Sequence, residues 1–404
     1  MKKVQIACMA VILALVAVTF ISTPVSAATT RWDSLNTLMI DTYDNPVSNG
    51  EGGYSIPGAE ASRLLPTYGA ITIFNERELL DDRPPITDLI KVRNFTRKLQ
   101  WKSGGEEFER YGGFSSNIAG AVNMKNSYYG VKLWQLLDGN DDIPGFSDLD
   151  DINATAALVF LNKTQSASGG FGIYEGFSPD LVSTYQALYI LDKMTVLSGE
   201  SWSTWLRNET ATIEFILSCR EDNGFKLSPS SSIVSLTASA AGLMALDLLS
   251  ELSQIPTDEQ QDMRNLILSL QDTDATDGSV GGFQESVLTN DTNLMSTYHA
   301  LEAIGVLGGM SSLDASAISQ FIADCQAANG GWGIVPDLEA GTLFYAGLAL
   351  EALRFLHPDG TYLNVINEID PNNPDTILID WRILFVVIFI IAALVIALIA
   401  LRQD

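Results

Sequence analysis

The stretch GGFQESVLTNDTNLMSTYHAL, from Gly281 to Leu301, joins a glycine pair and an aromatic residue to a polar loop and a helix-like run of small and aromatic residues. A glycine–aromatic signal of this kind recurs six times along the chain. The second glycines of these signals, at steps of 49 to 60 residues, are Gly53, Gly113, Gly170, Gly224, Gly282 and Gly331. Self-similarity at a nearly fixed period indicates a repeat architecture, so the repeat decides the fold.

Each repeat contains two stretches with helical character. The stretch before the glycine signal has one apolar face, as in residues 257–270, where apolar residues recur at spacings of three and four. The stretch after the signal, as in residues 294–307, is apolar on nearly all sides and is therefore expected to be buried. Six such pairs predict an all-α fold, an α/α toroid with an inner and an outer ring of helices around a central cavity. An open solenoid is the alternative.

Both ends of the chain carry apolar runs. Residues 1–27 have two lysines, an apolar core and a small-residue exit, which is the form of a secretory signal peptide; whether it is cleaved stays open. Residues 383–401 are apolar and uncharged over a length that spans a bilayer as a helix. Between these runs we expect the toroid at 31–356 and a stalk at 357–382, and a short tail follows at 402–404. The chain is thus predicted to be a single-pass protein of the cell membrane with its ectodomain outside the cell.

The charge of the chain limits its partners. The formal net charge is −26, which repels nucleic acid and anionic lipid headgroups. Arg63 and Lys125 are the only basic residues near the expected starts of the inner helices, and they lie in different repeats. The sequence therefore predicts no nucleic-acid partner and too little positive charge to hold a diphosphate well.

Two cysteines lie outside the signal peptide, Cys219 and Cys325, in similar sequence contexts in two different repeats. Equivalent positions of separate repeats are expected to lie farther apart than the ~7 Å between Cα atoms that a disulfide can bridge. We therefore expect two buried thiols. The chain also has five Asn-x-Ser/Thr sequons, which are candidate glycosylation sites in an exported protein: Asn94, Asn153, Asn162, Asn208 and Asn290.

The helix, glycine–aromatic turn, polar loop and Ser-Thr-Tyr-x-Ala-Leu run together resemble the repeat of the protein prenyltransferase β subunits and the squalene and terpene cyclases. The resemblance covers residues 31–356 and implies an α/α toroid with isoprenoid-processing relatives. In the prenyltransferases it implies a zinc site, made by an Asp-x-Cys pair that opens one inner helix and a His that opens the next.

The positions that match these zinc ligands are occupied by Asn293, Met295 and Gly341. None of the three can serve as the expected ligand, so we predict that zinc is absent and that no other cofactor is bound. The chain has two histidines. We expect His299 to be a hydrogen-bonded histidine of an inner helix and His357 to be a solvated residue at a helix end.

Two acidic patterns offer other chemistry. The cyclase signature Asp-x-Asp-Asp occurs as Asp148-Leu149-Asp150-Asp151, but it precedes an outer helix, where acidic residues stabilise the helix dipole. The loop 138–151 around it alternates oxygen ligands like a calcium loop but lacks glycine at the sixth position, so a solvated loop is favoured over calcium binding. Glycosidases also use toroids with paired carboxylates. The spacing of the four acids on or beside the glycine–aromatic loops singles out no pair: Glu175, Asp180, Glu285 and Glu339.

The sequence favours a binding or scaffold domain for an apolar or isoprenoid ligand or a protein partner, without catalysis. An isoprenoid-processing enzyme, either a prenyltransferase or a terpene-cyclase-like transferase, and a glycosidase are the alternatives. The mouth of the cavity is expected to be lined by residues that open the inner helices: Tyr68, Asn126, Tyr128, Ser183, Tyr185, Asn293, Thr297, Tyr298, Thr342 and Tyr345. Tyrosine-rich, uncharged walls suit an apolar ligand. The alternative is that these tyrosines simply fill the core of the ring.

Overall fold

The computed structural model describes residues 29–43, 51–59, 61–77, 88–138, 152–274, 280–368 and 370–372. The chain divides into two units, of which Arg31–Glu368 is the helical body. Of the other unit, the structure describes short segments, in which the backbone N–H of Asp370 donates to the carbonyl of Thr29 at 3.0 Å.

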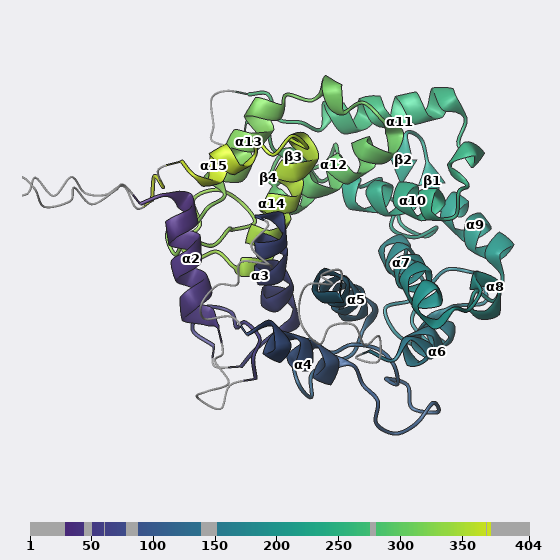
Figure 1. Cartoon of the computed structure of the whole chain (residues 1–404). Coiled ribbons are helices and arrows are strands. Elements are labelled where there is room, and N and C mark those ends of the chain that lie inside the picture. Colours follow the sequence, from purple (N-terminus) through teal and green to yellow (C-terminus); the bar gives the residue numbers. More distant parts are fainter. Residues whose placement is uncertain are drawn as a thin grey trace, which may run out of the picture. The chain divides into compact units, whose positions relative to one another are not determined.

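Six helices of the body form an inner ring (Figure 1). Each packs against the inner helices of the neighbouring repeats, and the last packs against the first, so the ring is closed. In chain order the inner helices are α3 (Leu64–Glu76), α5 (Met124–Asp138), α7 (Leu181–Ser198), α10 (Leu236–Leu248), α12 (Leu294–Leu307) and α14 (Leu343–Leu356).

Six further helices lie outside this ring (Figure 1), and each precedes the inner helix of its repeat. These outer helices are α2 (Arg31–Thr42), α4 (Leu89–Leu99), α6 (Ala154–Thr164), α9 (Glu209–Ser218), α11 (Thr257–Ser269) and α13 (Ala315–Asp324). Short helices complete the body: α8 (Trp202–Trp205), α15 (Leu363–Ile366) and the 3₁₀ turns η3 (Leu252–Gln254) and η4 (Met310–Ser312). The predicted α/α toroid is confirmed, and the contact between α14 and α3 rules out an open solenoid.

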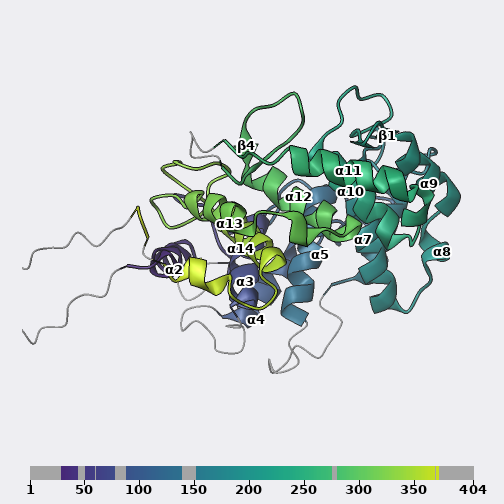
Figure 2. The ribbon, with the colours of Figure 1, turned by 90° about the horizontal axis from the view of Figure 1, so that it is seen from above.

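The turns from outer to inner helices lie along one face of the ring, which we call the loop face (Figure 2). Two of them contain small antiparallel ladders, in which β1 (Arg220–Glu221) pairs with β2 (Gly224–Phe225) and β3 (Phe283–Gln284) pairs with β4 (Thr292–Asn293). Because every inner helix begins after such a turn, the N-termini of all six inner helices point to the loop face.

Glycine is required in these turns by close contact between backbones. Gly112 has a φ of +88°, and a Cβ built on it would lie 1.7 Å from the carbonyl oxygen of Ala156 in the next outer helix. Gly281 has a φ of +92°, and its Cβ would lie 2.2 Å from the carbonyl oxygen of Ala317. The glycine signal therefore marks the point where each turn packs on the following repeat.

The fourth residue of the inner helix explains the Ser-Thr part of the repeat. In five repeats its hydroxyl accepts a hydrogen bond from the backbone N–H of the aromatic residue in the turn, as from Phe283 to Thr297 Oγ1 at 3.0 Å. The five hydroxyl residues are Thr67, Ser127, Thr184, Ser239 and Thr297, and the sixth repeat has Ala346 at this place. These hydroxyls therefore hold each turn onto its own inner helix.

The first and last repeats join at a tight seam. On the inner side, α3 and α14 cross so closely that a Cβ on Gly69 would lie 2.0 Å from the carbonyl oxygen of Leu343. On the outer side, Arg31 Nη1 donates to the carbonyl oxygen of Ala323 at 2.9 Å and to Gln326 Oε1 at 3.1 Å. Both contacts close the ring without a covalent link.

Several predicted segments lie outside the described residues. These are the signal peptide (1–27), the expected membrane span (383–401), the tail (402–404) and part of the stalk. In the described part of the stalk, α15 packs against α2 and α13, and Ile366 is fully buried. Among the residues that the structure describes, no helix has the length and apolar character needed to cross a membrane.

Cys219 and Cys325 occupy equivalent places, at the C-terminal ends of α9 and α13. Both are buried and neither forms a disulfide. Burial raises the pKa of the Cys219 thiol to about 11 and also raises the pKa of Cys325, so both stay protonated at neutral pH. The prediction of two buried thiols is confirmed.

Candidate functional site in the ring interior

The helical period decides which side chains face the axis of the ring. In each inner helix, the second, fifth, sixth and ninth residues share one face, because they are spaced by three, four or seven positions. The second and ninth residues differ by about 10 Å of axial rise. The second-position layer, nearest the loop face, consists of Leu65, Lys125, Val182, Thr237, Met295 and Phe344. The ninth-position layer consists of Thr72, Lys132, Tyr189, Met244, Glu302 and Glu351.

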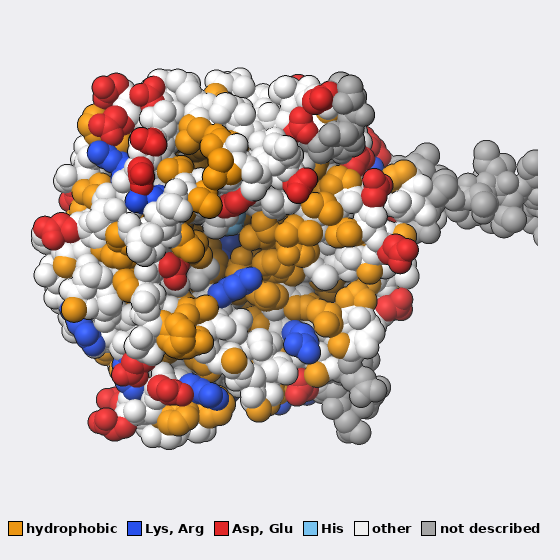
Figure 3. Space-filling model, turned by 180° about the vertical axis from the view of Figure 1, so that it is seen from behind, with side chains coloured by type: hydrophobic (Ala, Val, Ile, Leu, Met, Phe, Trp, Pro, Cys, Tyr) orange, Lys and Arg blue, Asp and Glu red, His pale blue; other side chains and the backbone are white. Residues whose placement is uncertain are grey.

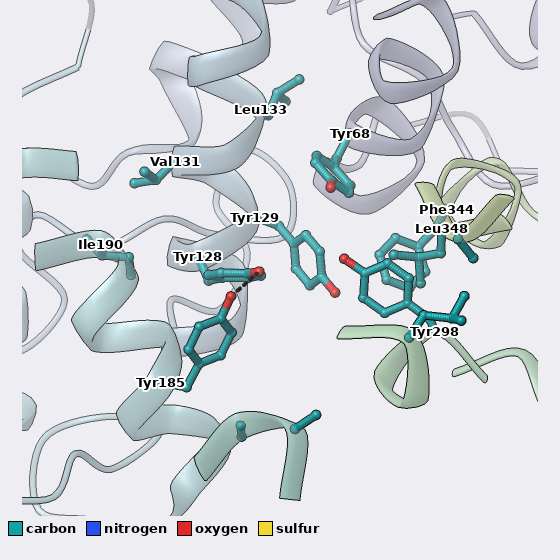
Figure 4. Close-up of a cluster of buried hydrophobic side chains, with 14 of the residues drawn as sticks. Tyr68, Tyr128, Tyr129, Val131, Leu133, Tyr185, Ile190, Tyr298, Phe344 and Leu348 are labelled. Atoms are coloured by element: carbon teal, nitrogen blue, oxygen red, sulfur yellow. Dashed lines mark hydrogen bonds between the residues drawn. The ribbon is translucent and has the colours of Figure 1, made fainter. Parts of the chain in front are cut away.

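Tyrosines dominate the layer between these two. Four of the six fifth-position residues are tyrosines from α3, α5, α7 and α12, and the rings of several point toward one another (Figure 4). The Tyr128 and Tyr185 hydroxyl oxygens lie 3.4 Å apart, and the rings of Tyr68 and Tyr129 have centroids 5.0 Å apart. Tyr129 in turn meets Phe344 edge to face at 5.2 Å. Aromatic side chains thus cross the ring from α7 to α14.

A charged pair lies below these tyrosines. Lys132 Nζ is 3.4 Å from Glu351 Oε1, and it also lies 5.2 Å from the ring centroid of Tyr68. Tyr68 donates to Glu351 Oε1 at 2.6 Å, and Tyr298 donates to Glu351 Oε2 at 2.9 Å. One carboxylate therefore links four inner helices, α3, α5, α12 and α14.

Burial and the charged pair shift the ionisation of this cluster. Burial raises the pKa of Tyr68 well above its ordinary value, and the Glu351 carboxylate raises it further. Burial works to lower the pKa of Lys132, but the attraction of Glu351 and of Tyr68 outweighs it, and the pKa lies well above its ordinary value. Burial also raises the pKa of Tyr298 well above its ordinary value, and the Glu302 carboxylate adds to the shift. The tyrosines are neutral and Lys132 is charged at neutral pH.

A second polar group lies on α12. His299 Nδ1 is 2.9 Å from Glu302 Oε2, and the Glu302 side chain is buried. Because a carboxylate only accepts hydrogen bonds, Nδ1 carries the proton of this contact, and in the neutral tautomer that the contact selects, Nε2 presents a lone pair. Burial raises the pKa of Tyr185, and the charge of Glu302 raises it further, so Glu302 lies near the tyrosines of the interior.

The interior is open to solvent. Although they lie six to nine residues into their helices, the side chains of Lys132, Glu351 and His299 keep 17%, 14% and 19% of their exposure. Figure 3 shows the side of the molecule opposite to Figure 1, where hydrophobic side chains surround a hollow with basic and histidine side chains visible in it. Solvent therefore reaches this polar cluster.

Comparison with known proteins agrees with this architecture. The family model for the prenyltransferase alpha-alpha toroid domain matches residues 14–208 and 178–372, which together make up most of the chain. The chain belongs to the prenyltransferase alpha-alpha toroid family. The predicted kinship with prenyltransferase β subunits and terpene cyclases is thereby confirmed. No curated protein sequence matches the chain.

Solved structures of this toroid family share the fold at low sequence identity. Protein geranylgeranyltransferase-I of Candida albicans, complexed with GGPP, has a TM-score of 0.57 and 16% identity, with 84% of this chain and 96% of that chain covered. The apo type II terpene cyclase MstE from Scytonema has a TM-score of 0.47 and 9% identity, with 82% and 99% covered. At such identities the likeness shows the fold alone.

The zinc site that the toroid family implies does not fit this chain. The Asn293 amide caps α12, with Oδ1 accepting from the backbone N–H of Ser296 and Nδ2 donating to Ser296 Oγ, both at 2.9 Å. Met295 offers only a thioether. At Gly341 a Cβ would lie 2.4 Å from the backbone carbon of Gly331, so the fold leaves no room for a histidine there. In the described part of the chain, no cluster of His, Cys, Asp or Glu could hold a metal ion.

The structure separates the ten residues expected at the cavity mouth into groups. Tyr68, Tyr128, Tyr185 and Tyr298 meet in the interior (Figure 4). Tyr345 is half-buried beside Phe344, with ring centroids 5.3 Å apart. The remaining five hold turns and helix starts by hydrogen bonds, and they are Asn126, Ser183, Asn293, Thr297 and Thr342.

The charged residues of the interior were missed in the sequence. The walls are not uncharged as expected, because Lys132, Glu302 and Glu351 lie among the tyrosines. Each is the ninth residue of its inner helix, on the face that also holds the fifth-position tyrosines, and a charge on that face is the signal that could have identified it. The sequence could not show that two of them form a pair across the ring.

The loop face is rich in exposed hydrophobic residues. Most of the exposed large hydrophobic side chains in the described ranges lie in the turns before the inner helices, and every one of the six turns contributes. The most exposed of these turn residues are Phe177, Val287 and Leu288, at 52%, 68% and 72%. An open groove of about 610 Å³ lies on this face between Asp180, Phe215 and Pro229. Exposed apolar side chains therefore form a rim around the opening of the ring on the loop face.

The remaining sequence motifs give no second site. The Asp-x-Asp-Asp string and nearly all of the calcium-like loop 138–151 lie outside the described residues. Of the glycosidase candidates, Asp180 caps α7, accepting from the backbone N–H of Ser183 at 2.8 Å, and Glu285 accepts from Ser296 Oγ at 2.8 Å and from the backbone N–H of Thr237. These two carboxylates are therefore engaged in holding helix starts.

The sequons lie in different settings. Asn153 and Asn208 are exposed caps at the starts of α6 and α9, and Asn290 is exposed on the loop face. Asn94 and Asn162 lie within outer helices and are partly buried. Their glycosylation stays a prediction.

Proposed function

We propose that this chain is a membrane-anchored, extracellular toroid that binds an apolar or isoprenoid ligand in the ring interior without converting it. The observation that carries the proposal is the character of the interior. An apolar chain that enters from the loop face meets an apolar rim and then aromatic surface. The basic group deepest in this path, Lys132, is already paired with Glu351.

The distribution of charge supports binding without diphosphate chemistry. Recognition of a diphosphate relies on several convergent basic side chains. On the ring-facing layers Lys132 is paired, and Lys125 lies at the loop face, 5.8 Å from the ring centroid of Phe344. The residues at the zinc positions also provide no ligands for a thiolate-activating metal. An isoprenoid as ligand class is supported by the shared fold, because the geranylgeranyltransferase-I structure contains GGPP.

Native mass spectrometry of the full-length chain, extracted from membranes, tests the proposal. We expect a bound lipid that is released by organic solvent. Val182→Trp places a large ring in the half-buried second-position layer of α7 and should remove the bound lipid. Val196→Trp makes the same change on the same helix at a side chain that is 78% exposed, and it should leave the lipid in place.

The outcome also separates binding from catalysis. The purified chain is incubated with geranylgeranyl diphosphate and separately with an isoprenoid alcohol, and the products are analysed. Recovery of the unchanged compounds fits a binding domain, whereas multiple turnover would overturn the non-catalytic part of the proposal. Equal lipid content in the Val182 and Val196 variants would overturn the position of the site.

The expected anchoring has its own test. Intact cells that express the full chain are treated with a protease, and the membrane fraction is then examined. We expect loss of the toroid with retention of a short membrane-bound fragment that contains residues 383–401. A toroid that is protected until the cells are opened would contradict the extracellular location.

A further inference from the structure

The open part of the interior contains polar groups without partners. The side chain of Gln186 on α7 is 8% exposed, and no residue of the described chain hydrogen-bonds to its amide. It is the sixth residue of its helix, the same place that Tyr129 and Leu348 occupy in their helices, and both of these face the interior (Figure 4). Its amide atoms keep contact with solvent, so water supplies the hydrogen-bond partners that a ligand in the interior would replace.

His299 and Glu302 on α12 are in a similar condition. His299 is also a sixth residue, and its Nδ1 bonds to Glu302 Oε2, while none of the described residues bonds to Nε2 or to Glu302 Oε1. Both of these atoms accept hydrogen bonds. The α12 pair therefore offers two acceptors, and the Gln186 amide on α7, which both donates and accepts, faces the same interior.

The local charge selects the kind of group that fits there. The ninth-position layer holds two buried or nearly buried carboxylates, Glu302 and Glu351, against one lysine, Lys132, which is paired with Glu351, while Lys125 lies in the second-position layer nearer the loop face. A phosphate or carboxylate next to Glu302 would meet like charge and acceptor atoms. A neutral hydroxyl can donate to one acceptor and accept from an amide, so its hydrogen-bonding capacity matches the site.

The depth of the site indicates how such a ligand lies. His299 and Glu302 are the sixth and ninth residues of α12, so they lie about 6 to 10 Å of helical rise beyond the second-position layer. Apolar side chains occupy most of that layer, and exposed hydrophobic residues surround it on the loop face. If the polar head of a ligand lies at His299, its apolar tail would therefore lie among the apolar side chains between the second-position layer and the loop face.

We propose that His299, Glu302 and Gln186 form a subsite for the hydroxyl group of a long-chain isoprenoid alcohol, which binds head-first with its tail toward the loop face. This inference rests on the proposed function and adds the chemical class of the ligand. The hydroxyl donates to His299 Nε2 or Glu302 Oε1 and accepts from the Gln186 amide. Its chemistry differs from that of a diphosphate, which presents only acceptors and negative charge.

Equilibrium binding of three probes to the full-length chain in lipid nanodiscs tests the subsite. The probes are geranylgeraniol, its methyl ether and geranylgeranyl diphosphate, which share one tail. The ether keeps the acceptor oxygen of the head and carries a methyl group in place of the donor hydrogen. We expect the alcohol to bind about tenfold tighter than the ether, the value of one hydrogen bond to a strong acceptor, and the diphosphate to bind more weakly than the alcohol.

Variants locate the effect. His299→Leu should reduce the ratio of alcohol to ether affinity toward one, while the affinity for the ether itself stays the same. Gln186→Leu should weaken the alcohol and the ether by a similar factor, because both oxygens can accept from the amide. His357→Leu is the matched control, because this second histidine bonds to Ser319 on the outer helix α13, and it should keep the ratio unchanged. Thermal unfolding of each variant shows that it is folded, and the two separate substitutions keep the test valid if one fails to fold.

The outcomes distinguish the two proposals. Tighter binding of the diphosphate, or an unchanged ratio in His299→Leu together with an unchanged alcohol affinity in Gln186→Leu, would overturn the hydroxyl subsite and leave the binding function standing. Absence of binding by all three probes would overturn the proposed function and this inference with it.

Discussion

Buried polar groups in two parts of the ring interior differ in how many hydrogen-bond partners they have. Glu351 of α14 receives hydrogen bonds from Tyr68 of α3 and Tyr298 of α12 and pairs with Lys132 of α5, so both of its carboxylate oxygens have partners. On the side of α7 and α12, Glu302 has a single partner, His299, and Gln186 has none among the described residues. Glu351 is therefore part of a paired network, whereas Glu302 and Gln186 keep hydrogen-bonding atoms that the proposed ligand would use.

The difference has a cause in the closure of the ring. The first and last repeats meet without a covalent link, at the glycine contact between α3 and α14. A carboxylate shared by four helices gives this seam a defined register, as buried ion pairs can do. Stability and ligand binding are therefore expected to respond to different residues, and substitution can separate them.

The largest effect is expected at Glu351. Glu351→Leu leaves Lys132 charged without its partner in a site where its side chain is only 17% exposed, and it also frees two tyrosine hydroxyls. We expect a loss of about 3–5 kcal/mol in the free energy of unfolding, measured by chemical denaturation of the full-length chain. The double variant Lys132→Met/Glu351→Leu should recover most of it.

The matched change on the other side is Glu302→Leu, where the carboxylate has one hydrogen-bond partner. We expect a loss below about 1 kcal/mol, because no buried cation is left behind. Similar losses at Glu302 and Glu351 would remove the distinction between the two sides.

The next largest effect is expected at the glycine crossing. Gly69→Ala places a Cβ about 2.0 Å from the carbonyl oxygen of Leu343, so the helices must separate, and we expect a loss of about 3 kcal/mol. Gly305→Ala in α12 is the control, because a Cβ there meets no atom within 4 Å. It should raise stability by up to about 1 kcal/mol through helix propensity. Equal effects of the two changes would show that the seam is not tightly packed.

The fold could be predicted from the sequence because it repeats six times. Glycines at positions such as Gly112 and Gly281 are required where the backbones of neighbouring repeats are in contact. The helical period identifies the tyrosines that face the interior, such as Tyr185. Each of these features is local to one repeat or to two successive ones, so a single sequence displays it.

The polar half of the site could not be predicted in this way. Lys132 and Glu351 are 219 residues apart in the chain, and they meet only because the ring closes. The pairing of His299 with Glu302 is local, at a spacing of three, but its position beside Tyr185 depends on the packing of α12 across the ring from α7. The sequence predicted the helices and tyrosines that form the site, whereas the pairing of its charged residues depends on closure of the ring.

A smaller effect separates two tyrosines of the same layer. Tyr68→Phe removes a hydrogen bond of 2.6 Å to the Glu351 carboxylate, and we expect a loss of about 2 kcal/mol. Tyr128→Phe removes a hydroxyl whose neighbour, Tyr185, lies 3.4 Å away, and we expect less than about 1 kcal/mol. Urea denaturation of both variants measures the contrast. A larger loss at Tyr128 would mean that the hydroxyl cluster, not the carboxylate, holds the interior together.

The smallest effect concerns pH and depends on the same hydroxyls. Burial and Glu351 raise the pKa of Tyr68 in the folded chain, whereas a tyrosine of the unfolded chain ionises near pH 10. The stabilisation is therefore fully present below about pH 10 and is lost as the pH rises toward the folded pKa, because only the unfolded chain releases the proton. The loss amounts to about 1.4 kcal/mol per pH unit for each such tyrosine.

Comparison of wild type with Tyr68→Phe at pH 8 and at pH 11 isolates the contribution of this one group. At pH 8 the variant should be the less stable of the two, since it lacks the hydrogen bond to Glu351. At pH 11 the difference should shrink by about 1.4 kcal/mol, because phenylalanine has no proton to lose when the chain unfolds. A difference that stays constant between these pH values would show that Tyr68 ionises as readily in the folded ring as in the unfolded chain, so that neither burial nor Glu351 holds its proton.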